Sequence, residues 1–157
     1  MKLLTKISDG LNRVTQILGA AFLIGMTVLI IVNAALRYVF NISIIWAYDV
    51  LRVLMVGLVF FCTCMVYYQK EHIRFVIIYD KYGPAFRKAF NVFVYLAGIL
   101  LFGVLGVTGL QLSVSLWNTK LASSGISNFW LYIFFSLSMF VLIIHGIRFI
   151  AEELERR

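Results

Sequence analysis

The chain has 157 residues, of which 62% are hydrophobic and 13% are charged. Soluble domains carry about 25% charged residues, so this composition excludes an ordinary soluble protein and makes the lipid bilayer the expected solvent. The formal charge of +7 does not indicate nucleic-acid binding. The Lys and Arg residues lie between apolar segments, where basic residues set topology and meet anionic lipid headgroups.

Four apolar segments are each long enough to cross about 30 Å of hydrocarbon, which takes about 20 helical residues. They are residues 14–36, 49–68, 84–117 and 128–151. The first is longer than the core of a signal peptide, about 7–15 residues, and is expected to be an uncleaved anchor. The third is long enough to tilt. The sequence therefore predicts an all-α integral membrane protein with a single domain, residues 1–157, and four transmembrane helices.

The distribution of cations predicts the orientation of these helices. An even number of spans places both termini on one side, and the opposite side receives only Arg37, Arg52 and Lys120. The terminal side collects Lys2, Lys6, Arg13, Lys70, Arg74, Lys81, Arg87, Lys88, Arg148, Arg156 and Arg157. Because loops rich in Lys and Arg stay in the cytoplasm, both termini are expected to be cytoplasmic.

The connection between the first two spans, residues 38–48, is too apolar for a solvated loop. It is expected to lie in the membrane interface, with Tyr38, Trp46 and Tyr48 at headgroup level. Asp49 then begins the second span, where a carboxylate meets the positive end of the helix dipole. Arg52 follows three residues later, close enough for an ion pair. We expect a structural cap and ion pair, with a role in transport gating as the alternative.

Two further segments have amphipathic or small-residue patterns. If residues 69–83 form a helix, Lys70, Arg74 and Lys81 project within about 40° of one another. This pattern is typical of an amphipathic helix on the inner leaflet, the alternative being a solvated basic loop. In the third span, small residues gather on less than half of the helix perimeter, which allows another helix to approach closely. They are Gly98, Gly103, Gly106, Gly109 and Ser113.

No reaction centre is evident. The central parts of the four spans contain no Asp, Glu, Lys, Arg or His, whereas a carrier or a small self-sufficient exporter would need such residues. Cys62 and Cys64 point about 200° apart on a helix and are expected to be buried free thiols. His72 and His145 both fall towards the cytoplasmic side, so a haem-binding membrane anchor subunit of a respiratory complex is the alternative function. An enzyme is not expected.

The order of the segment NAALRYVFNISIIWAYDVLR (residues 33–52), a second span and then KEHIRF (residues 70–75) resembles the small, Q-type (DctQ-like) membrane subunit of the tripartite ATP-independent periplasmic (TRAP) transporters. The matching residues are Asn33, Arg37, Tyr38, Asn41, Trp46, Asp49, Arg52, His72, Ile73 and Arg74. The chain departs from the family where Asp49 stands in place of the commoner Glu. Ser127 and Ser136 lie in a region where the family often has prolines.

The resemblance implies a four-helix subunit of the bacterial inner membrane. Its partner is a large M-type permease subunit that carries the substrate and sodium, so no cofactor is expected in this chain. A periplasmic substrate-binding protein delivers an organic anion, such as a carboxylate or a sialic-acid-like anion, to this secondary transporter, a symporter. We hypothesise that the chain braces the static part of the large subunit.

The remaining roles follow from the same resemblance. Residues 38–48 and 117–127 would help to dock the binding protein, through Tyr38 and Lys120. Arg37, Asn41, Trp46, Asp49, Arg52, His72 and Arg74 are expected to contact the large subunit or phospholipid headgroups. The sequence does not identify the transported substrate.

Overall fold

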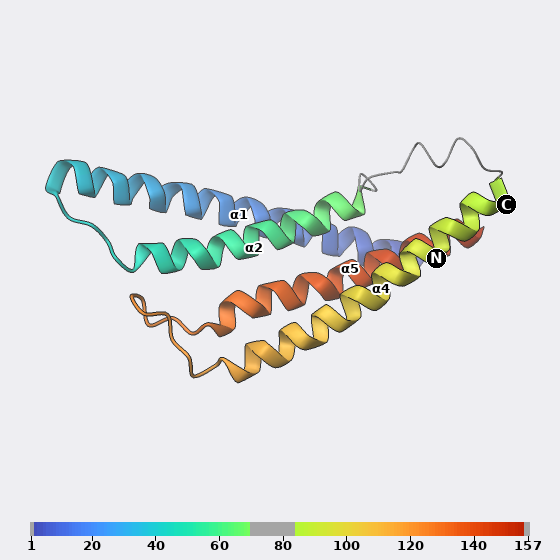
Figure 1. Cartoon of the computed structure of the whole chain (residues 1–157). Coiled ribbons are helices and arrows are strands. Elements are labelled where there is room, and N and C mark those ends of the chain that lie inside the picture. Colours follow the sequence, from blue (N-terminus) through green and yellow to red (C-terminus); the bar gives the residue numbers. More distant parts are fainter. Residues whose placement is uncertain (1, 70–83, 156–157) are drawn as a thin grey trace.

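The computed structural model describes residues 2–69 and 84–155 (Figure 1). Four helices make up nearly all of these residues: α1 (Lys2–Phe40), α2 (Ala47–Tyr68), α4 (Pro84–Ser115) and α5 (Phe129–Glu155). All four are long and apolar enough to cross a membrane. The predicted all-α fold with four membrane spans is confirmed.

The helix ends differ from the predicted spans mainly at α1. This helix begins at Lys2 rather than Val14 and continues to Phe40. Its 39 residues give a length of about 58 Å at 1.5 Å per residue, nearly twice the hydrocarbon thickness. The amphipathic helix predicted for residues 69–83 lies, apart from Gln69, outside the described residues.

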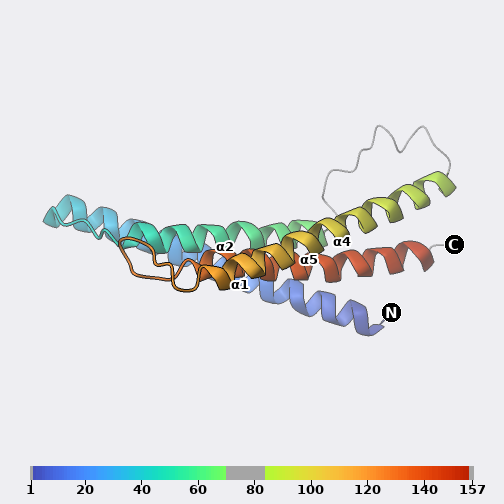
Figure 2. The same cartoon turned by 60° about the horizontal axis from the view of Figure 1, so that its bottom comes forward.

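The helices form two antiparallel hairpins, α1 with α2 and α4 with α5 (Figures 1 and 2). Helix α5 joins the hairpins, because it contacts α4, α2 and, more lightly, α1, whereas α4 packs almost entirely on α5. The start of α1 and the end of α5 lie at the same end of the molecule, which we call the termini end. The other end, with residues 41–46 and 116–128, is the loop end.

The core lies along α5. Cys64, Met139 and Leu142 are buried together and are surrounded by aromatic and branched side chains of α2, α4 and α5. The Cys64 Sγ donates a hydrogen bond to the Ser138 carbonyl oxygen at 3.4 Å. Cys62, in contrast, is exposed. The expectation of a buried free thiol is therefore right for Cys64 and wrong for Cys62.

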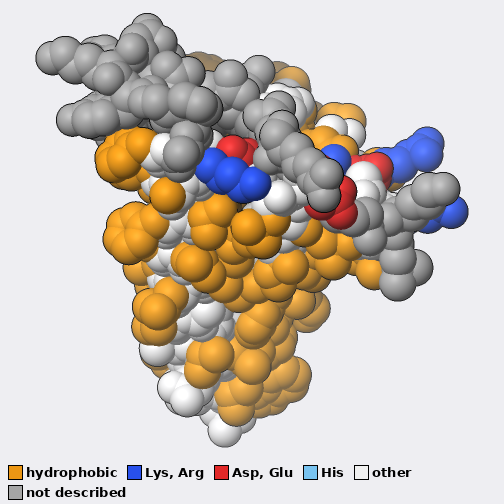
Figure 3. All heavy atoms as spheres, turned by 90° about the vertical axis from the view of Figure 1, so that its right-hand side faces the viewer, with side chains coloured by type: hydrophobic (Ala, Val, Ile, Leu, Met, Phe, Trp, Pro, Cys, Tyr) orange, Lys and Arg blue, Asp and Glu red, His pale blue; other side chains and the backbone are white. Residues whose placement is uncertain are grey.

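Most of the outer surface is apolar. Figure 3 shows charged side chains gathered in a band beside the undescribed residues, with hydrophobic side chains covering the surface below them. Helices α1 and α4 are the least buried of the four, and large apolar side chains such as Ile24, Ile31, Phe93 and Leu100 are more than 60% exposed. In a membrane these faces meet lipid or another protein.

Candidate functional site

The loop end is shaped by two asparagines. Asn41 ends α1 in the left-handed region, with φ of 57°, a conformation that Asn tolerates better than most residues. The Ile42 amide then donates back to the Leu36 carbonyl oxygen at 3.3 Å. Asn33, inside α1, accepts a hydrogen bond from the Ile44 amide at 3.0 Å. The connection from α1 to α2 is therefore held by a side chain two turns inside α1.

Asp49 ties the two hairpins together at the loop end. One of its carboxylate oxygens accepts hydrogen bonds from the Ser123 amide at 2.9 Å and the Ser124 amide at 2.8 Å. These amides belong to the connection between α4 and α5. The expected ion pair with Arg52 is not among the ion pairs of the described residues, so the structure gives Asp49 a capping role on another part of the chain.

The other residues predicted for this end are exposed. Tyr38 is 90% exposed and Trp46 is 48% exposed, and the side chains of Arg37, Arg52 and Lys120 are also exposed. They are available to lipid or to partner proteins. His72 and Arg74 lie outside the described residues.

The α4–α5 connection has a defined backbone. Lys120 and Ser127 form an isolated antiparallel bridge, and the Leu121 amide donates to the Ile126 carbonyl oxygen at 2.8 Å. The Ser127 hydroxyl accepts a hydrogen bond from the Phe129 amide at 3.1 Å, at the start of α5. This connection, together with the Asp49 carboxylate, presents a folded surface at the loop end.

The small residues of α4 mostly face α5. Gly106 and Gly109 approach Met139 and Phe135, and the Ser136 hydroxyl donates to the Gly106 carbonyl oxygen at 2.6 Å. Ser113 is also fully buried. A methyl group on Gly98 would lie within 4.0 Å of Phe102 and Tyr67, whereas one on Gly103 would meet nothing within 4 Å. The stripe therefore serves mainly to pack the two helices of one hairpin.

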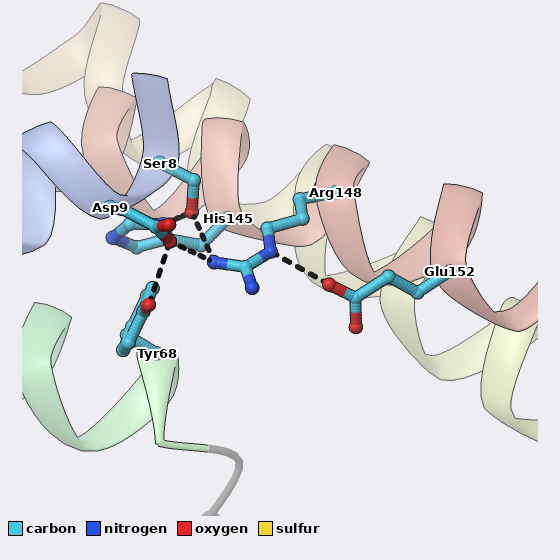
Figure 4. Close-up of polar contacts among 6 residues, drawn as sticks. All are labelled: Ser8, Asp9, Tyr68, His145, Arg148 and Glu152. Atoms are coloured by element: carbon cyan, nitrogen blue, oxygen red, sulfur yellow. Dashed lines mark hydrogen bonds and ion pairs between the residues drawn. The ribbon is translucent and has the colours of Figure 1, made fainter. Parts of the chain in front are cut away.

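A second polar assembly, which the sequence analysis did not identify, lies at the termini end. It joins α1, α2 and α5 and consists of Ser8, Asp9, Tyr68, His145, Arg148 and Glu152, the termini-end cluster (Figure 4). Arg148 forms ion pairs with Asp9 at 2.8 Å and with Glu152 at 2.7 Å.

Hydrogen bonds complete this cluster. The Tyr68 hydroxyl donates to the same Asp9 carboxylate oxygen at 2.7 Å. The Ser8 hydroxyl and the His145 Nδ1 are 2.7 Å apart, and both residues are fully buried. The Arg148 guanidinium lies 5.0 Å from the centre of the Tyr68 ring. The cluster fixes the first turns of α1 against α2 and α5.

One sequence signal could have revealed this contact. Ser8, Asn12 and Thr15 recur at a spacing of four and three residues, which places them on one face of a helix, and all three are buried. A polar stripe at helical spacing ahead of the apolar segment indicates that the helix begins earlier and that its polar side has partners. The partners of Ser8 and Asp9 are at least 59 residues away along the chain and leave no local signal.

The structure gives His145 a structural partner in Ser8. His72, the other histidine of the haem alternative, lies outside the described residues. Within residues 2–69 and 84–155, no three His, Cys, Asp or Glu side chains come together in a way that could hold a metal ion. The two polar assemblies tie helices and connections together.

The family model described as "Tripartite ATP-independent periplasmic transporters, DctQ component" matches residues 26–156. This stretch includes α2, α4, α5 and the second part of α1, and leaves Ser8 and Asp9 outside. A search of curated proteins found no match.

Proposed function

Because the chain belongs to the family of DctQ components of tripartite ATP-independent periplasmic transporters, we propose that it braces a large, M-type transport subunit and helps to dock the periplasmic binding protein. The membership makes it a multi-pass membrane protein and a small permease subunit of such a transporter, and implies both of these partners. The resemblance seen in the sequence is thereby confirmed.

The main support for the bracing role is that the two hairpins are fixed to each other while their outer surface is apolar. Polar contacts hold the hairpins together at both ends, through Asp49 at the loop end and Arg148 at the termini end. Between these ends, residues 14–36, 53–69, 89–119 and 129–144 contain no Asp, Glu, Lys, Arg or His. Such spans offer no polar path for an anion, but they can enlarge the membrane footprint of a subunit that does.

The finer assignments belong to the same proposal. Sodium and the organic anion, a carboxylate or a sialic-acid-like molecule, bind in the large subunit, and this chain holds no cofactor. The complex lies in the bacterial inner membrane and works as a symporter. The termini end, where α1 starts and α5 ends, carries Lys6, Arg13 and Lys88. These cations support a cytoplasmic position for both termini.

The loop end is then periplasmic and faces the binding protein. Tyr38 and Lys120 are exposed there, and Asp49 holds the α4–α5 connection in a single arrangement. A folded connection docks a partner at a lower entropic cost than a flexible one.

Copurification tests the assignment to the large subunit. The chain, carrying an affinity tag, is coexpressed with the large subunit, and recovery of the pair is compared between the native chain, Asp49→Ala and Glu155→Ala. Asp49→Ala should lower the recovery because it releases the α4–α5 connection, whereas Glu155→Ala, an exposed charge at the other end, should not. Failure of the native chain to recover the large subunit would refute the partnership. Unchanged recovery with lost sodium coupling would instead place Asp49 in the transport cycle.

A further inference from the structure

A groove of about 400 Å³ opens on the face formed by α2, α4 and α5. This volume lies within the range of pockets that bind small ligands, about 300–1,000 Å³. The residues that line it are Arg52, Val56, Phe60, Thr108, Gly109, Leu112, Leu131, Tyr132 and Phe135. The two residues changed in the copurification test, Asp49 and Glu155, do not line this groove.

The groove is polar at one end and apolar along the rest of its length. Arg52, from the first turns of α2, and Tyr132, from the first turn of α5, lie at the loop end. Val56 and Phe60 continue the lining towards the middle of the membrane. Thr108 adds little polarity, because its hydroxyl donates to the Val104 carbonyl oxygen at 2.8 Å in its own helix.

The cation at the mouth is exposed and can bind an anion. The Arg52 side chain interacts electrostatically with Asp49, but it is not among the salt bridges of the described part of the chain. Trp117 and Trp130, at the neighbouring ends of α4 and α5, are 59% and 48% exposed. Exposed tryptophans gather at headgroup level in membrane proteins, so Arg52 lies near the depth of lipid phosphates.

The length and lining of the groove fit a single hydrocarbon chain. From Arg52 to Phe60 the lining runs for about 12 Å, at 1.5 Å per residue, and Val56 and Phe60 give it an apolar surface beyond Arg52.

We propose that this groove binds one phospholipid of the leaflet at the loop end. The phosphate contacts the Arg52 guanidinium, which suits phosphate oxygens because of its planar set of donors. One acyl chain extends along Val56 to Phe60. The lipid fills the open space between α2 and α4, with α5 at its base. It thereby completes the contact between the two hairpins.

Native mass spectrometry of the full chain tests the proposal. The chain is reconstituted in nanodiscs of equimolar phosphatidylethanolamine and phosphatidylglycerol and released into mild detergent, and the fraction that retains phospholipid is measured. Arg52→Gln should lower the retained fraction about fivefold, which is the effect of one cation near an anionic headgroup. The control is Lys120→Gln, an exposed cation at the same end that does not line the groove, which should retain lipid as the native chain does.

A second pair of variants tests the apolar part. Val56→Trp fills the groove and should abolish retention, whereas Val59→Trp, on an exposed side of α2, should not. The Arg52 variant decides the question even if Val56→Trp fails to fold, because the Arg52 side chain is exposed.

Three outcomes would overturn the proposal. They are equal retention in Arg52→Gln and Lys120→Gln, a bound mass of inorganic phosphate without lipid, and a photocrosslinker at Val56 that captures the large subunit instead of lipid in the assembled complex. The first two concern this chain alone, so they are distinguishable from a failure of the partnership with the large subunit.

Discussion

Replacing Gly109 by alanine should weaken the packing of α4 on α5. A Cβ atom at this position would lie 2.7 Å from Cδ1 and 2.9 Å from Cε1 of Phe135, well inside ordinary van der Waals contact. The Phe135 ring cannot simply swing away, because it packs edge-on against Phe60 with centroids 4.8 Å apart. Gly103, two turns earlier on the same helix, would meet nothing within 4 Å and supplies the matched control.

The magnitude follows from two opposing effects. Overpacking of a well-filled contact costs about 1–3 kcal/mol. Alanine in place of glycine inside a helix gains about 1 kcal/mol, and both variants receive this gain. The free energy of unfolding of Gly109→Ala should therefore be about 1–3 kcal/mol lower than that of Gly103→Ala, a change of roughly 5- to 150-fold in the folding equilibrium.

The assay is reversible unfolding of the purified chain by titrating sodium dodecyl sulfate into mild-detergent micelles, followed by far-ultraviolet circular dichroism. The comparison of two Gly→Ala changes on one helix removes the shared effect on the unfolded chain. Equal stability of the two variants would refute the assignment of Gly109, and of the packing stripe, to the α4–α5 contact.

Three further predictions concern other contacts. Asp49→Asn should speed hydrogen exchange of the amides that Asp49 binds in the α4–α5 connection, measured by mass spectrometry; unchanged exchange would contradict the capping role. Arg148→Gln should lower the free energy of unfolding in the same titration by only about 1 kcal/mol, because Asp9 is half exposed and solvent screens the pair; a loss several times larger would show that the pair is more buried than the structure has it. Gly57→Ala places a Cβ atom against the Phe22 ring and should be about 1–3 kcal/mol less stable than Gly103→Ala because of overpacking, and equal stability of these two variants would disprove the close α1–α2 contact there.

The fold was predictable from the sequence because a bilayer permits few solutions. Each segment must satisfy its backbone hydrogen bonds internally, so four apolar segments of sufficient length require four helices. The start of α1 was less predictable, because polar residues before Val14 lower the hydropathy of a segment that is nevertheless helical. Its stability there comes from Asp9 and Ser8 meeting α2 and α5, a tertiary contact that hydropathy does not record.

The candidate site was also predictable from the sequence only in part. The sequence marks Asp49 as unusual, since a carboxylate at the start of a membrane span calls for a partner, and the nearest cation, Arg52, is the natural choice. The structure supplies Ser123 and Ser124 instead. Backbone amides have no sequence signature, so a carboxylate that binds them across 74 residues cannot be found by spacing. For the glycine stripe, spacing finds the face but does not identify α5 as the neighbour.

The most direct test of the bracing role is transport by the purified large subunit in liposomes, measured with and without this chain, with its binding protein, substrate and a sodium gradient present. Uptake should require the chain, and the chain alone should move no substrate. Equal uptake by the large subunit without it, or flux through the chain alone, would contradict the account.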